Sequence, residues 1–282
     1  MALHPLIEAQ ELHALLAAPG DVVLLDVRWA LGDPNGHAHY LDGHLPGAVF
    51  VDLHHELAAA PTPEAGRHPL PTAEAFHAAA QRWGINPGSR VVVYDATRAL
   101  AAARAWWLLR HAGFENVRVL NGGLDAWTGA GYPLERGEHT AAAGTVELGW
   151  DRLPTIDIDE AENFPGALLD ARAFERYTGA TEPIDPRAGH IPGALSNPTT
   201  ENLGADGRFL DPSELAERFA ALGVQASDGE KRPVAAYCGS GVTAAHQILA
   251  LETIGVRAAL FPGSWSQYSA DPTRTPATGE TP

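Results

Sequence analysis

The sequence predicts two consecutive α/β domains, each a parallel sheet with helices on both faces. Two observations indicate this fold class. The second half of the chain repeats the pattern of the first half, and within each half short apolar runs alternate with helical stretches. Alternating strands and helices with apolar strands are typical of a parallel sheet that is covered on both sides. A chain of 282 residues is long enough for two ordinary domains.

Three segments of the first half recur in the same order, at nearly the same offset, in the second half. The paired segments are 22–30 ("VVLLDVRWA") with 166–174 ("GALLDARAF"), 42–53 ("DGHLPGAVFVDL") with 188–199 ("AGHIPGALSNPT"), and 90–127 with 233–268. We therefore expect a tandem duplication of one domain, with an N-terminal domain over residues 1–140 and a C-terminal domain over 150–282.

The expected elements of the first half begin with an amphipathic helix that carries Ile7 and Leu12 near the N-terminus. Thr72 is a suitable N-cap for a later helix because Glu74 follows in its first turn. The expected strands are Val22–Val27, Val49–Val51, Val91–Tyr94 and Val117–Leu120, and the other expected helices are Thr72–Trp83 and Ala99–His111.

In the second half one helix should follow Asp211, which is a cap residue with proline at the first helical position. Another should run from Val242 to Ile254. The expected strands are Leu168–Asp170, Val234–Tyr237 and Ala258–Phe261. Segment 132–155 has little periodicity and is expected to be the linker. The tail after Asp271 is expected to be loose because it is rich in proline and threonine.

Composition excludes several classes of protein. The formal net charge is −16, and an acidic protein repels nucleic-acid backbones and anionic lipid surfaces. No apolar run approaches the length of a membrane span, and the N-terminus does not resemble a signal peptide. One cysteine permits no internal disulfide, which fits a reducing compartment. The expected location is therefore the cytoplasm, with neither nucleic acid nor membrane as a partner.

The repeat separates structural features from candidates for chemistry. His44 and His190 occupy the same Gly-His-(Leu/Ile)-Pro-Gly-Ala turn, so both are expected to hold that turn in place. The Asp-x-Arg pairs at 26/28 and 170/172 also recur and are expected to be ion pairs at strand ends. The halves differ at Asp95, whose place in the second half is taken by Cys238.

Cys238 follows an apolar strand and precedes a glycine-rich loop and a helix. Gly239 and Gly241 allow a short loop to turn its N–H groups inward, and the helix N-terminus adds unpaired donors and partial positive charge. Both effects stabilise a thiolate at the base of the loop. A lone cysteine is more often an inert core residue, but core packing requires no glycine at both positions. The sequence therefore predicts a nucleophile at Cys238.

The chain resembles the rhodanese superfamily over nearly its whole length, and in particular two-domain sulfurtransferases with an inactive N-terminal and an active C-terminal domain. The resemblance therefore implies tandem rhodanese-like domains. The loop of Cys238, Gly239, Ser240, Gly241, Val242 and Thr243 is similar to that of 3-mercaptopyruvate sulfurtransferases. Thiosulfate-preferring relatives tend to carry Arg and Lys after the cysteine, where this chain has the neutral Gly239 and Ser240.

The resemblance implies a ping-pong cycle without a cofactor or metal. Cys238 takes a sulfur atom from a small donor, forms a persulfide that the loop N–H groups hold, and passes the sulfur to an external thiol, such as that of a thioredoxin-like protein, or to cyanide. The expected donor is 3-mercaptopyruvate. Thiosulfate, with the same persulfide, is the alternative, and a non-catalytic sulfur carrier or binding module is the third reading.

Further roles follow from the resemblance. Segment 175–183 ("ERYTGATEP") places substrate binding on Arg176, and Arg187 is the candidate for the second arginine that many relatives carry downstream. Segment 65–71 ("AGRHPLP") makes His68 the partner of Ser240 in a Ser–His–Asp relay, reaching across from the first domain. The relay lacks an aspartate at the expected place, because His54 occupies that place and Asp52 is two residues away. Trp265 in "PGSWSQY" fits a second active-site loop but is equally suited to packing.

Two other chemistries fit less well. A cysteine-dependent phosphatase needs an arginine six positions after its cysteine, and position 244 is alanine. A zinc site could be sought among five histidines of the first half, but one cysteine and scattered histidines give it little support. These histidines are His37, His39, His44, His54 and His55.

Overall fold

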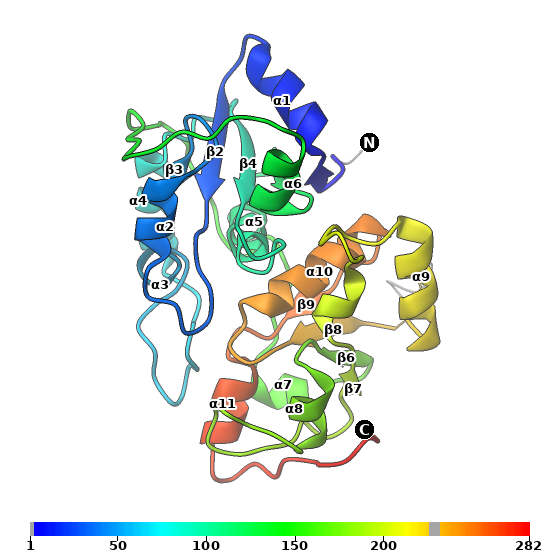
Figure 1. Ribbon diagram of the computed structural model, residues 1–282. Helices are drawn as coiled ribbons and strands as arrows, with labels where there is room; N and C mark the ends of the chain where they lie inside the picture. The colour runs from blue at the N-terminus through cyan, green and yellow to red at the C-terminus, as the bar shows by residue number, and fades with distance from the viewer. Residues whose placement is uncertain (1–2, 226–231) are drawn as a thin grey trace. The chain divides into compact units, whose positions relative to one another are not determined.

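The computed structural model describes residues 3–225 and 232–282, and its contacts divide the chain into two units (Figure 1). One unit consists of Met1–Ala59 and Pro71–Arg152, and the other of Ala60–Leu70 and Leu153–Pro282. The short segment 60–70 therefore packs with the second unit, although it lies within the first half of the sequence.

The first unit is built on a five-stranded parallel sheet in the order β1-β5-β4-β2-β3. Its apolar core includes Leu24, Val92 and Trp127. The strands are β1 (Leu6–Ile7), β2 (Val22–Asp26), β3 (Val49–Phe50), β4 (Arg90–Tyr94) and β5 (Val117–Leu120). The helices are α1 (Ala9–Ala17), α2 (Gly36–Asp42), α3 (Leu53–Glu56), α4 (Ala73–Arg82), α5 (Ala102–His111) and α6 (Gly123–Gly129).

The second unit has a four-stranded parallel sheet in the order β7-β6-β8-β9. In Figure 1, α10 runs alongside β8 and β9, which it contacts. The strands are β6 (Ala167–Asp170), β7 (Leu195–Ser196), β8 (Val234–Tyr237) and β9 (Ala259–Leu260). The helices are α7 (Ile158–Glu162), α8 (Phe174–Thr178), the 3-10 helix η1 (Thr199–Asn202), α9 (Pro212–Ala221), α10 (Thr243–Thr253) and α11 (Ser264–Ala270).

The strands and long helices predicted from the sequence are confirmed to within about three residues at each end, but Ile7, which was expected in the first helix, lies in β1. Thr72 caps α4 by accepting the N–H of Ala75, and Asp211 forms a capping box with Glu214 at the start of α9. The elements that sequence analysis missed are short: β1, β7, η1 and the helices α2, α3, α6, α7, α8 and α11.

The expectation of a loose tail after Asp271 is wrong. Ala277 pairs with the backbone of His190 through two N–H···O bonds of 2.9 Å. Arg274 forms ion pairs with Asp159 and Glu162 of α7. The proline-rich composition lowers the propensity of the tail for regular structure, but these contacts dock it on the second unit.

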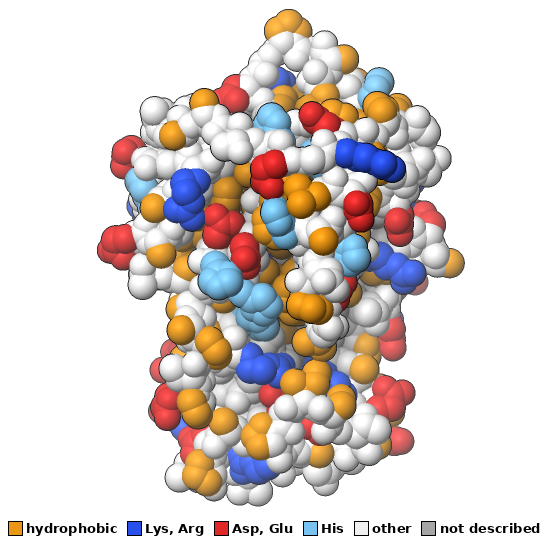
Figure 2. Space-filling view, turned by 60° about the vertical axis from the view of Figure 1, so that its left-hand side comes forward, with side chains coloured by type: hydrophobic (Ala, Val, Ile, Leu, Met, Phe, Trp, Pro, Cys, Tyr) orange, Lys and Arg blue, Asp and Glu red, His pale blue; other side chains and the backbone are white. Residues whose placement is uncertain are grey.

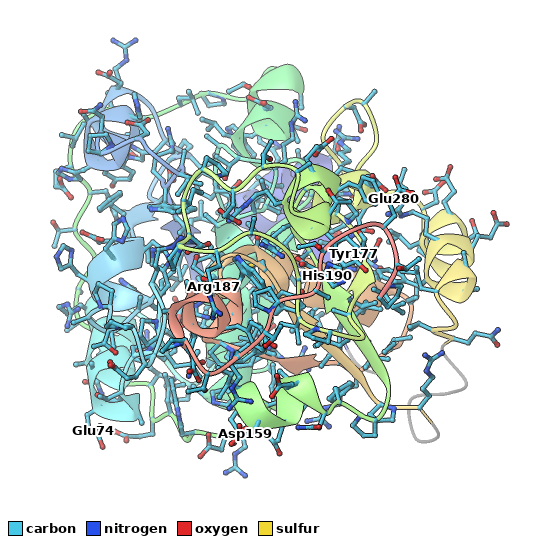
Figure 3. All side chains as sticks on the ribbon, turned by 90° about the horizontal axis from the view of Figure 1, so that it is seen from below. Glu74, Asp159, Tyr177, Arg187, His190 and Glu280 are labelled. Atoms are coloured by element: carbon cyan, nitrogen blue, oxygen red, sulfur yellow. The ribbon has the colours of Figure 1, made fainter. Side chains whose placement is uncertain are left out.

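The repeated features hold equivalent turns in both units, as the sequence predicted. Arg28 is paired with Asp26 at 2.6 Å, and Arg172 is paired with Asp170 at the same distance. The ring nitrogen Nδ1 of His190 hydrogen-bonds the carbonyl oxygen of Tyr177 at 2.8 Å, and the two rings stack face to face. The two residues lie close together in Figure 3. His44 bonds the carbonyl of Tyr40 at 2.9 Å in the same way.

No helix of the described residues has both the length and the apolar character that a membrane crossing requires. On the face shown in Figure 2, acidic side chains are dispersed among basic, histidine and hydrophobic ones. The negative charge of the protein is therefore not gathered into one patch on this face.

Candidate active site

Cys238 lies immediately after β8, at the carboxyl end of a central strand of the second sheet. Its side chain is buried, with 1% exposure, and its Sγ accepts the N–H of Gly241 at 3.1 Å. Helix α10 begins at Thr243, five residues after Cys238, and among the described residues no side chain caps its N-terminus. The sulfur is thus held by a loop amide beside the positive end of a helix dipole, which is the arrangement expected for a nucleophilic thiol.

The loop needs glycine at position 241. Gly241 has a φ of +81°, and a Cβ there would come within 2.4 Å of the carbonyl oxygen of Pro262. Both the left-handed backbone and this close approach exclude a larger residue. The glycine lets the loop turn sharply enough to return an N–H group to the sulfur of Cys238.

A second loop, 262–266, fixes the backbone of the cysteine loop. Trp265 donates its N–H to the carbonyl of Cys238 at 3.0 Å, and Ser266 donates to the carbonyl of Gly239 at 2.9 Å. Ser264 is fully buried at a φ of +52°, and its hydroxyl accepts the N–H of Cys238 at 3.2 Å. The hydroxyl also donates to the carbonyl of Phe261, so two hydrogen bonds offset the backbone strain at Ser264.

Segment 60–70 brings His68 to the cysteine loop. The Nδ1 atom of His68 lies 2.8 Å from the hydroxyl oxygen of Ser240, and both side chains are buried. The segment is held by the carbonyl of Glu64, which accepts from Gln267, and by the N–H of Arg67, which donates to Ser266. His68 therefore meets Ser240 as the sequence predicted, but from a segment that packs within the second unit.

Two arginines flank the position that follows the cysteine. A Cβ at Gly239 would lie 3.0 Å from Nη2 of Arg67 and 3.3 Å from Nη1 of Arg176. Arg176 is paired with Glu182 at 2.7 Å, and both arginines are paired with Asp185. Sequence analysis named Arg176 and missed Arg67, although Arg67 is the neighbour of His68 in the quoted motif.

The structure does not bring Arg187 into this group. The guanidinium of Arg187 donates to backbone carbonyl groups at the end of α11, which it adjoins in Figure 3. Trp265 is completely buried, packs over the guanidinium of Arg172 at 4.4 Å, and donates its ring N–H to the carbonyl of Arg187. Val242 is also buried, and Thr243 begins α10.

The equivalent loop of the first unit is filled by its own carboxylate. Asp95 is fully buried and accepts four backbone N–H groups at 2.8–2.9 Å, from Thr97, Ala99, Ala101 and Ala102. The backbone amides of this type of loop can therefore bind a negatively charged group. In the first unit the charge is a fixed part of the protein.

Neither Asp52 nor the histidines of the first half assemble a second site. Asp52 caps α3 and accepts from His55, while His54 accepts the ring N–H of Trp29 at 3.0 Å. The other histidines considered for zinc contact separate partners: His37 contacts Glu138, His39 contacts Asp33, and His44 contacts Tyr40. A cavity of about 790 Å³ in the first unit is lined partly by His37, His54 and His55. Among the described residues, no three His, Cys, Asp or Glu side chains are placed to hold a metal ion.

Comparison with known proteins identifies the fold of both halves. The family model of the "Rhodanese-like domain" matches residues 8–130 and again residues 156–271. The chain belongs to the rhodanese family.

Relatives of similar length carry sulfurtransferase names. The "Putative thiosulfate sulfurtransferase SseB" of Mycobacterium tuberculosis is 46% identical, and the match covers 95% of each chain. The "Probable 3-mercaptopyruvate sulfurtransferase" of Pseudomonas aeruginosa is 45% identical, and the match covers 99% of this chain and 100% of that relative. The two names differ in the sulfur donor.

A solved structure extends the match to three dimensions. The crystal structure of SseA from Escherichia coli, described as showing the "Rhodanese" fold and catalytic mechanism of 3-mercaptopyruvate sulfotransferases, superimposes with a TM-score of 0.80 at 32% identity. It covers 93% of this chain and 99% of the SseA chain. This rhodanese-family chain therefore has the two-domain architecture throughout.

Proposed function

We propose that this rhodanese-family protein is a sulfurtransferase that moves sulfur from 3-mercaptopyruvate to a thiol or cyanide through a persulfide on Cys238. The arrangement at Cys238 carries this proposal. Its Sγ accepts a loop N–H beside the start of α10, and Arg67 and Arg176 flank the next residue. These contacts support the role of Cys238 as a stabilised nucleophile and of the two arginines as the cations that bind a carboxylate.

The first half-reaction transfers one sulfur atom. The Cys238 thiolate attacks the sulfur of 3-mercaptopyruvate, an S–S bond forms, and the C–S bond breaks with its electron pair leaving on carbon. The proton of the donor thiol ends on that carbon, so the products are the Cys238 persulfide anion and pyruvate. Gly239, Gly241, Val242 and Thr243 supply the loop backbone, and the inward amides of this loop would hold the outer sulfur.

The second half-reaction restores the enzyme. A thiolate or cyanide attacks the outer sulfur, and Cys238 leaves as the thiolate, so charge and atoms balance without an added oxidant. Because the described chain has one cysteine, the acceptor is external. A small thiol or a thioredoxin-like protein could accept the outer sulfur of the persulfide. The single free cysteine also fits a reducing cytoplasm.

The choice of donor can be measured directly. We expect kcat/KM to be higher for 3-mercaptopyruvate than for thiosulfate with one shared acceptor, since Gly239 and Ser240 add no charge to the loop. The intact protein should gain the mass of one sulfur atom after exposure to donor alone. Because the M. tuberculosis relative is named for thiosulfate, thiosulfate is the second candidate, and a higher kcat/KM for it would reverse the assignment.

We propose that Ser240 and His68 move the proton of the first half-reaction, and their 2.8 Å contact supports this role. Replacing His68 with glutamine should lower kcat with 3-mercaptopyruvate about 10²-fold, because pyruvate forms only when its carbon is protonated. Thiosulfate leaves as sulfite and needs no such proton, so kcat with thiosulfate should change little. The Ser240→Ala variant should show the same contrast. An equal loss with both donors would instead mean that His68 acts by supporting the loop.

The first unit is proposed to be non-catalytic. Its loop carries Asp95 where the second carries Cys238, and a carboxylate cannot form a persulfide. The four N–H groups that could stabilise a sulfur anion there are already bonded to Asp95.

A further inference from the structure

Asp185 is a buried carboxylate that joins the two arginines beside the cysteine loop. One oxygen accepts from Nη1 of Arg67 at 2.9 Å, and the other accepts from Nη2 of Arg176 at 3.0 Å. The side chain is only 3% exposed, whereas those of Arg67 and Arg176 are 29% and 16% exposed. Water therefore reaches the arginines but hardly reaches the carboxylate between them.

One terminal nitrogen of each guanidinium group lies close to Gly239, the residue that follows Cys238. Nη2 of Arg67 and Nη1 of Arg176 are the atoms nearest to a Cβ that would be built on this residue. These nitrogen atoms are not the ones that bond Asp185, since Arg67 uses Nη1 and Arg176 uses Nη2 for that contact. An anion next to Cys238 could therefore bind the two arginines while Asp185 still holds them.

The charges of this cluster cancel. Arg172 is paired with Asp170, and the charges of Arg67 and Arg176 are matched by Asp185 and Glu182. Burial raises the pKa of Asp185, and Glu182 adds to that effect although Arg67 opposes it. Two guanidinium contacts would otherwise hold a carboxyl pKa low. Because each arginine is matched by a carboxylate, the donor meets two arginines but no excess of positive side-chain charge.

We propose that Asp185 is a specificity-determining residue that favours a donor with one negative charge over a donor with two. It positions Arg67 and Arg176 for a carboxylate and at the same time cancels one of their charges. A monoanion such as 3-mercaptopyruvate is repelled by Asp185 once, and a dianion such as thiosulfate twice. The inference rests on the proposed function, since it concerns the donor of the same site.

Replacing Asp185 with asparagine separates charge from shape. The amide has the same size and keeps one oxygen acceptor for an arginine, but it removes the negative charge. We expect kcat/KM for thiosulfate to rise about tenfold relative to kcat/KM for 3-mercaptopyruvate, mainly through a lower KM. The Arg67→Gln variant should shift the same ratio in the opposite direction.

The matched control is Glu217→Gln, which removes one negative charge from the exposed face of α9. It should leave the donor ratio unchanged. A donor ratio within twofold of wild type in Asp185→Asn, or a shift of that variant toward 3-mercaptopyruvate, would overturn the inference and leave the sulfurtransferase function intact. Wild-type protein that turns over neither donor and gains no sulfur would overturn the proposed function, and this inference with it.

Discussion

Replacing Cys238 with serine should lower sulfur transfer from either donor by at least about 10³-fold, because the variant lacks the thiolate that attacks the donor in the first half-reaction and leaves in the second. A serine hydroxyl is not ionised near neutral pH, and the loop amide and helix dipole cannot make it an equivalent sulfur carrier. The measurement is turnover with cyanide as acceptor, together with the intact mass after exposure to each donor. The variant should gain no sulfur atom.

Serine is the appropriate replacement because it preserves the local structure. Its smaller hydroxyl can still accept the N–H of Gly241, so the fold of the loop and the unfolding temperature should stay close to those of the wild type. A non-catalytic sulfur carrier whose binding does not use Cys238 would keep its function in this variant. Turnover that survives the Cys238→Ser change would exclude the persulfide mechanism.

The parts of the site that sequence analysis predicted are those set by short stretches of chain. A strand, a cysteine, two nearby glycines and a helix place Cys238 at the end of β8 with the N-terminus of α10 close by. The internal repeat also predicted that His190 and Asp170 have structural roles, because His44 and Asp26 occupy the equivalent positions in the first half. The strands and long helices were predictable for the same reason, since each carries its own apolar pattern.

The parts that were missed depend on contacts between distant segments. Arg67 matters because segment 60–70 folds against residues near 185 and 266, and no local pattern encodes that docking. The neutral Gly239 was the available signal, since a site for an anion must take its cations from elsewhere in the chain. Arg187 was named because its position resembles that of a donor-binding arginine. Its side chain instead donates to carbonyl groups of α11, a contact that its sequence position does not reveal. Short helices such as α3 and α8 are stabilised by packing and show no periodicity of their own.

Asp95 offers a test of how strongly this type of loop holds an anion. Arg98 and Ala99 have φ values of 61° and 69°, a left-handed conformation that costs about 1–2 kcal/mol per residue. The buried carboxylate of Asp95 offsets this cost by accepting four N–H groups. Replacing Asp95 with asparagine should lower the free energy of unfolding of the first unit by about 3–5 kcal/mol, since the amide loses charge and about half of the acceptor capacity.

Urea unfolding of Asp95→Asn, compared with Asp125→Asn on the exposed side of α6, would measure this cost. Both variants lose one carboxylate, so a general charge effect cancels, and only Asp95→Asn should move the midpoint. Equal midpoints would mean that the loop amides do not prefer an anion, which would also weaken the proposed stabilisation of a persulfide by the loop that follows Cys238. A large difference would support one physical principle in both units, with a permanent carboxylate held in the first and a transient sulfur anion in the second.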